Sequence, residues 1–143
     1  MEALFPGSSQ AQRRFPVEVT GLGTDGKAAG LGAATVRGWE VEHACGAPPL
    51  ALRVELGGTS FAYSGDTQWT AALAEAAHGR TCSRWRPTPS TGRIRYHLDY
   101  QTLRAHLGEI GARRIVLTHM SGAITRLTDA DLPAAYDGMT ADL

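Results

Sequence analysis

The stretch Phe61-Ala62-Tyr63-Ser64-Gly65-Asp66-Thr67 is a short apolar run that ends in a small, acidic turn. Aromatic and small apolar residues, bounded by Gly57-Gly58 before and by Ser64-Gly65 after, predict a buried strand. An apolar pattern with three- and four-residue spacing follows, so Thr67 is expected to be the N-cap of a helix. Asp66 would then be held by backbone N–H groups and face a cleft. The alternative is an ordinary turn residue, and the rest of the chain has to decide between the two.

Composition excludes several classes of protein. The chain has 143 residues with fourteen acidic and fourteen basic side chains, which suits one ordinary domain and does not favour bulk binding to nucleic acids or membranes. Cys45 and Cys82 lack a CxxC partner, so neither a disulfide framework nor a cysteine zinc knuckle is expected. No apolar stretch approaches the roughly 20 residues of a membrane span, and no signal-peptide core is present. We therefore expect a soluble, cytoplasmic protein.

The remaining elements follow from periodicity. Alternating residues predict strands over 15–19, 34–43 and 50–56, joined by short turns and a glycine-rich hairpin segment over 21–32, so an antiparallel sheet is expected. Residues 100–110 predict one helix with Gly111 as its C-cap, residues 113–119 a strand, and residues 139–143 a last strand. The expected fold is α/β (α+β): one mainly antiparallel or mixed sheet.

Three of the strand-like runs end in residues that can bind a metal, namely His43, Asp66 and His119. Strands of one sheet present their ends along a common edge, so residues far apart in the sequence can converge there. Imidazole and carboxylate groups suit zinc or a similar divalent ion, and a carboxylate can bridge two ions. Taken singly, each histidine is more often a surface group or a satisfied core group.

The other histidines are weaker candidates. His97 precedes the predicted helix in Tyr96-His97-Leu98-Asp99, where the alternative is a neighbour of the N-cap. His78 and His106 lie within helical patterns and are interpreted as solvated surface residues.

Four motifs occur in an order that resembles the C-terminal half of metallo-β-lactamase-fold hydrolases. They are His43-x-x-Gly46 with the strand that follows it, Tyr63-Ser64-Gly65-Asp66-Thr67, Tyr96-His97, and Ile115-Val116-Leu117-Thr118-His119-Met120-Ser121. The resemblance covers residues 43–121 and extends to the tail at 135–139. It is closest to the branch of tRNA 3′-processing endonucleases and related phosphodiesterases.

The resemblance implies a fold, a site and a reaction. The fold would be the C-terminal half of a four-layer αββα sandwich, with helices on one face of the sheet. His43 would bind a first zinc, Asp66 would bridge two ions, and His119 would bind the second; manganese and iron also suit such ligands. His97 would stabilise the transition state or protonate the leaving oxygen, while Asp99 is close enough in sequence to orient it. The reaction would be hydrolysis of a small-molecule or nucleotide ester by a metal-activated water.

The sequence also departs from this family. Its hallmark His-x-His-x-Asp-His loop is missing, so residues 1–143 are expected to form a single, partial domain with weak metal binding and little hydrolysis. Such a half-sandwich exposes an apolar sheet face, which favours a homo-oligomer or a complementing N-terminal half as partner. The alternative function is a non-catalytic scaffold or binding domain. Nucleic-acid binding is not indicated, because most of the arginines that would favour it lie in the unusual stretch over 80–92.

Residues 80–92 occupy the place of a buried apolar strand but read RTCSRWRPTPSTG. Lys27 is the only lysine beside many arginine, alanine and glycine residues, which indicates a GC-rich gene. Back-translated with GC-rich codons and read one base earlier, the stretch gives ADLLAVEAYPFDR, an apolar strand followed by an acidic loop. Our hypothesis is a pair of compensating frameshifts; the alternative is a natural basic loop.

Overall fold

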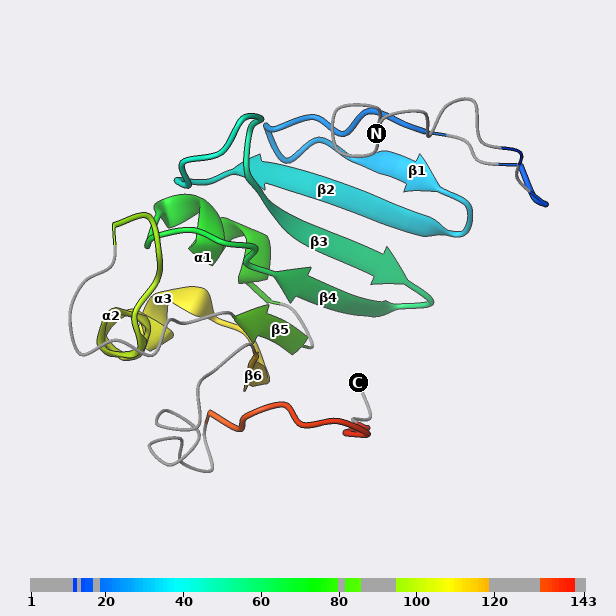
Figure 1. The fold of residues 1–143 in the computed structure, drawn as a ribbon. Coiled ribbons are helices and arrows are strands. Elements are labelled where there is room, and N and C mark those ends of the chain that lie inside the picture. Colours follow the sequence, from blue (N-terminus) through cyan, green and yellow to red (C-terminus); the bar gives the residue numbers. More distant parts are fainter. Residues whose placement is uncertain are drawn as a thin grey trace.

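The computed structural model describes residues 12, 14–16, 19–79, 82–85, 95–118 and 132–140. Its described strands form one six-stranded sheet in chain order (Figure 1): β1 (Ala29–Leu31), β2 (Ala34–Glu40), β3 (Leu50–Leu56), β4 (Thr59–Tyr63), β5 (Cys82–Trp85) and β6 (Ile115–Leu117). The described helices are α1 (Ala71–Ala77), α2 (Tyr100–Ala105) and α3 (Leu107–Ile110).

The sheet is mixed, and the connections explain why. Strands β1 to β4 pair antiparallel, whereas β5 pairs parallel with β4 and β6 pairs parallel with β5. Turns and short loops join the antiparallel strands, while the parallel ones are linked by longer crossovers containing α1 or the α2–α3 pair, as parallel pairing requires. This confirms the predicted sheet. Strands β2, β4, β5 and β6 therefore all run in one direction, and their C-terminal ends lie at the same edge.

Several predicted strand boundaries were wrong. β2 ends at Glu40, before His43, and the glycine-rich segment contains β1 with its turn at Gly32 and Ala33. In the predicted strand over 15–19, the described residues are not extended into a strand, and Pro16 lacks the N–H that pairing needs. Residues 17 and 18 lie outside the described part.

The helices also begin and break at unexpected places. α1 has Thr70 as its N-cap, because the Thr67 hydroxyl is bound elsewhere: it accepts from the Glu42 N–H (3.1 Å) and donates to the Gln68 carbonyl (2.7 Å). The helix predicted over 100–110 is divided at His106 into α2 and α3. Gly111 is confirmed as the left-handed C-cap, with φ 60°.

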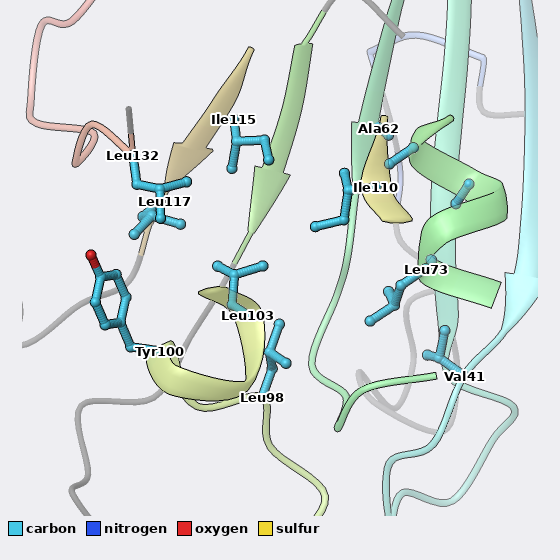
Figure 2. Close-up of a cluster of buried hydrophobic side chains, with 13 residues drawn as sticks. Val41, Ala62, Leu73, Leu98, Tyr100, Leu103, Ile110, Ile115, Leu117 and Leu132 are labelled. Carbon is cyan, nitrogen blue, oxygen red and sulfur yellow. The ribbon is translucent and has the colours of Figure 1, made fainter. Parts of the chain in front are cut away.

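The helices cover one face of the sheet, and the core lies between them and the strands (Figure 2). α1 packs on β2, β3 and β4, and it also contacts α3. Alternate residues of β3 and β4, such as Ala51 and Ala62, point toward these helices and are buried. The fully buried large side chains are Leu73, Leu98, Leu103, Ile110, Leu117 and Leu132. The predicted arrangement of helices on one face is confirmed.

The opposite face of the sheet is apolar and only partly covered. Leu52 and Val54 alternate with the buried Ala51 and therefore point away from α1. Val54 pairs with Phe61 of β4, and both side chains are half-buried. At the end of β3, Leu56 is 56% exposed. Apolar surface therefore extends along both strands on this face.

β5 and the tail complete the sheet. β5 forms within the unusual stretch over 80–92 and lies between β4 and β6 in the sheet. At the end of β6, the Leu117 N–H donates to the Pro133 carbonyl (2.9 Å), and the Ala135 N–H donates to the Leu117 carbonyl (2.7 Å). The segment over 133–135 therefore pairs with β6. Met139 and Thr140, at the start of the predicted last strand, are not in a strand, and residues 141–143 lie outside the described part.

Candidate metal centre

The predicted metal ligands follow strands that end at the same edge of the sheet. His43 is the third residue after β2, Asp66 the third after β4, and His119 the second after β6. In Figure 1 the β2–β3 connection, the chain leaving β4 and the yellow-green segment before α2 lie at the same end of the sheet. These strand ends thus share one edge of the sheet; His119 itself lies outside the described residues, so the convergence of the three side chains stays a prediction.

Hydrogen bonds join the segment after β4 to the segment after β2. The Glu42 N–H donates to the Thr67 hydroxyl (3.1 Å), and the Gln68 N–H donates to the Glu42 carbonyl (3.1 Å). The side-chain amide of Gln68 also donates to the Glu42 carboxylate. Glu42 precedes His43 and Thr67 follows Asp66, so these bonds hold the two candidate ligands on adjacent segments.

Gly65 makes the turn that presents Asp66. Its φ of 65° lies in the left-handed region, and a Cβ there would stand 2.8 Å from the Leu50 carbonyl oxygen. Both conditions require glycine at this position. Asp66 is half-buried, and its Oδ1 atom is shielded from solvent.

The imidazole of His43 is oriented by the main chain. Its Nδ1 lies 3.1 Å from the backbone carbonyl oxygen of Tyr96. Because a carbonyl oxygen can only accept, Nδ1 carries the proton in this hydrogen bond. Nε2 then keeps its lone pair, and hydrogen bonding through the other ring nitrogen is how proteins orient metal-binding histidines.

His97 lies against His43 although the two residues are far apart in the sequence. Their ring centroids are 5.1 Å apart with an interplanar angle of 79°. His97 also lines a cavity of about 450 Å³ with Gln68, Trp69 and Arg95 among its walls. The candidate acid thus contacts a candidate ligand and lines a cavity of the size that small molecules occupy.

Two neighbouring residues differ from expectation. Asp99 caps α2: its carboxylate accepts from the Thr102 N–H (2.8 Å) and from the Thr102 hydroxyl (2.7 Å), which gives it a structural role. His106 is half-buried instead of solvated, because its ring stacks on Trp69 with centroids 4.0 Å apart. Its Nδ1 also lies 2.7 Å from the Glu109 carboxylate, an i,i+3 spacing that the sequence displays and that could have identified this contact.

The donors suit a divalent ion in kind, but the described part supplies too few of them. His43 offers Nε2 and Asp66 offers a shielded carboxylate oxygen, which are ordinary zinc donors. Within the described ranges, no group of three or more His, Cys, Asp or Glu side chains could hold a metal ion. A four-coordinate site would need His119 and further donors.

Solved structures share the fold of this chain. The metallo-β-lactamase-fold protein YhfI from Bacillus subtilis superposes with a TM-score of 0.72 at 13% identity, covering 96% of this chain and 61% of its own. The short form of human tRNase Z gives 0.61 at 16% identity, covering 82% and 48%. Zinc-bound PqqB from Methylobacterium extorquens gives 0.62 at 18% identity, covering 82% and 54%. No family model and no curated protein matches the sequence.

The chain therefore has the metallo-β-lactamase fold, as its motifs predicted, over part of the length of these structures. It spans less than two thirds of each of the three chains. Identities of this size establish the fold alone. Among the described residues, none of the helices has the length and apolar character needed to cross a membrane.

Proposed function

We propose that this chain is part of a metal-dependent hydrolase that cleaves phosphodiester or related ester bonds. The observation that carries the proposal is the common edge at the C-terminal ends of β2, β4 and β6, where His43 and Asp66 lie on hydrogen-bonded segments. The family resemblance, tRNase Z and zinc-bound PqqB support the choice of metal and substrate class. The absence of the His-x-His-x-Asp-His loop from the sequence supports an incomplete site.

Each side chain has a defined role in this proposal. His43 through Nε2, Asp66 and His119 would hold zinc, with Asp66 bridging two ions in a complete site and with manganese or iron as alternatives. The chemistry that zinc supplies when bound is a nucleophilic water at neutral pH. His97, oriented by its contact with His43, would protonate the leaving oxygen or stabilise the charge that develops on the ester.

The cavity beside His97 supports an anionic ester as the substrate. Arg95 lines this cavity together with His97, and its guanidinium lies 4.7 Å from the centroid of the Tyr96 ring. Asp99 lines the cavity too, but its carboxylate accepts two hydrogen bonds from Thr102. Gln68 and Trp69 line the same cavity, with one face of the indole stacked on His106. A phosphate oxygen suits the guanidinium, and a planar leaving group suits the indole.

Hydrolysis of bis(p-nitrophenyl) phosphate with added zinc or manganese tests the proposal. We expect slow, metal-dependent turnover that Asp66→Ala abolishes and that His97→Ala lowers by about 100-fold, the usual contribution of a general acid. His78→Ala is the matched control, because His78 is exposed and lies outside the cavity beside His97. Turnover that survives Asp66→Ala would contradict the role proposed for this carboxylate, and robust turnover with tight zinc binding would contradict an incomplete site.

The second candidate function is a non-catalytic binding domain that pairs with a complementing segment or a second copy of itself. The half-buried apolar row that includes Leu52, Val54 and Phe61 favours it. Sedimentation of the wild type and of Val54→Lys tests this candidate: association that the lysine abolishes supports it, and a monomer at all concentrations argues against self-pairing. A cytoplasmic setting belongs to both proposals, and the free, exposed thiol of Cys45 supports it.

A further inference from the structure

Tyr96 has an unusual backbone conformation at the centre of the candidate site. Among the described residues it is the one non-glycine residue with a positive φ, 66°. L side chains disfavour this left-handed region, Asn tolerates it well, and β-branched residues tolerate it worst. A conformation of this kind persists only where the surrounding structure holds it, and such residues gather at functional sites.

The left-handed turn connects the groups that the mechanism uses. The Tyr96 carbonyl oxygen lies 3.1 Å from Nδ1 of His43. The next residue is His97, whose ring contacts the ring of His43 at 5.1 Å. One peptide unit thus orients the candidate ligand and presents the candidate acid. The phenol ring has a different contact, with the Arg95 guanidinium, 4.7 Å from the ring centroid.

We propose that the left-handed turn at Tyr96 is a positioning element for His43. Its backbone directs the carbonyl at Nδ1 and fixes the tautomer with the proton on Nδ1, which leaves the lone pair on Nε2. The phenol ring is not required for this role. The tautomer does not depend on a bound metal, whereas its use in binding zinc rests on the proposed function.

Two variants separate the backbone from the ring. Tyr96→Asn and Tyr96→Val both remove the phenol, but only asparagine readily adopts a positive φ. We would record ¹⁵N spectra of the imidazoles without metal at pH 8, assigning His43 by its loss in His43→Ala. The wild type and Tyr96→Asn should show His43 with the proton on Nδ1, and Tyr96→Val should show a mixture of tautomers.

Zinc affinity provides a second measurement on the same proteins. We expect Tyr96→Val to bind zinc about tenfold more weakly, the usual effect of losing an outer-shell partner, and Tyr96→Asn to match the wild type. If Tyr96→Val does not fold, Tyr96→Ala replaces it as a milder change. A wild-type His43 with its proton on Nε2, or equal behaviour of the asparagine and valine variants, would overturn the proposal. Zinc binding that is insensitive to Asp66→Ala would instead overturn the proposed function and leave the tautomer result standing.

Discussion

The two faces of the sheet differ both in composition and in what covers them. On the face under α1, Ala51 and Ala62 are at most 3% exposed, and Leu73 of the helix packs into the same core. On the other face, Leu52 and Val54 come from the same strand as Ala51 and are only half-buried. On β3 the side toward α1 carries one alanine and two charged residues, whereas the large apolar residues are on the other side: Leu50, Leu52, Val54 and Leu56. The large apolar side is therefore the one that the described helices leave open, and a further layer on it stays a prediction.

The largest expected change in the free energy of unfolding is that of Leu73→Ala on the covered face, compared with Leu52→Ala on the other face. Leu73→Ala should lower the free energy of unfolding by about 2–5 kcal/mol, because it leaves a cavity in a closed core. Leu52→Ala removes the same atoms from a half-buried side chain and should cost about 1 kcal/mol. Urea unfolding of both variants measures the difference. Equal costs would mean that both faces are closed.

The next effect concerns β5, the strand between β4 and β6. Replacing residues 80–92 by ADLLAVEAYPFDR should raise the free energy of unfolding by about 2–3 kcal/mol, because one or two apolar side chains become buried in the sheet. The control replaces only residues 86–92 and leaves Cys82–Trp85 as they are. A full replacement that is no more stable than this control would contradict the frameshift hypothesis, and resequencing the gene tests it independently.

Arg53 is a charged residue on the covered face of the sheet, and we expect its replacement to have the third largest effect on stability. It is only 9% exposed, and its Nε donates to the Ala76 carbonyl (2.8 Å) at the end of α1. Arg53→Met should cost about 2 kcal/mol, because it removes charged hydrogen bonds to helix carbonyls. Arg37→Met is the comparison on β2: Arg37 is partly exposed, its ion pair with Glu55 is long (3.9 Å), and it donates one hydrogen bond to the Gly26 carbonyl (3.1 Å), so we expect about 1 kcal/mol. Thermal unfolding that ranks the two variants in the reverse order would contradict this account of Arg53.

The smallest effect is expected at the exposed pair formed by Asp25 and Lys27. Their side-chain hydrogen bond lowers the pKa of Asp25 and raises that of Lys27. The stability that the ionised Asp25 contributes is therefore present above its unfolded pKa of 3.8 and is lost as the pH falls through its folded pKa. The stability that the charged Lys27 contributes is present below its unfolded pKa of 10.5 and is lost as the pH rises through its folded pKa. Because both side chains are exposed, Asp25→Asn should leave the unfolding midpoint unchanged at pH 7 and at pH 3. A midpoint that shifts with Asp25→Asn would show that surface charge matters more than burial in this sheet.

Local patterns predicted the parts of the fold that local forces determine. Leu50–Leu56 matches its predicted strand because the period of two is unbroken, and Gly111 ends α3 because the left-handed C-cap favours glycine. The N-cap was misplaced because the Thr67 hydroxyl binds Glu42, a contact 25 residues away in the chain. Such long-range contacts leave no periodic signal.

The sequence indicated which strand ends share an edge of the sheet, whereas metal binding by the residues at that edge stays a prediction. The positions of His43 and Asp66 after strands indicated a common edge, and the topology agrees. The Tyr96 turn and the stacking of Trp69 on His106 depend on segments brought together by folding. No propensity indicates that a tyrosine will adopt a positive φ, so the sequence could not reveal this element.

Zinc titration of the purified chain, with elemental analysis, tests the central claim that the strand ends form part of a metal centre. The comparison is with an Asp66→Ala, His119→Ala double variant, and His78→Ala serves as the control. We predict that the wild type and the control bind zinc weakly and that the double variant does not bind it. Equal binding by the wild type and the double variant, or no binding by either, would contradict the claim.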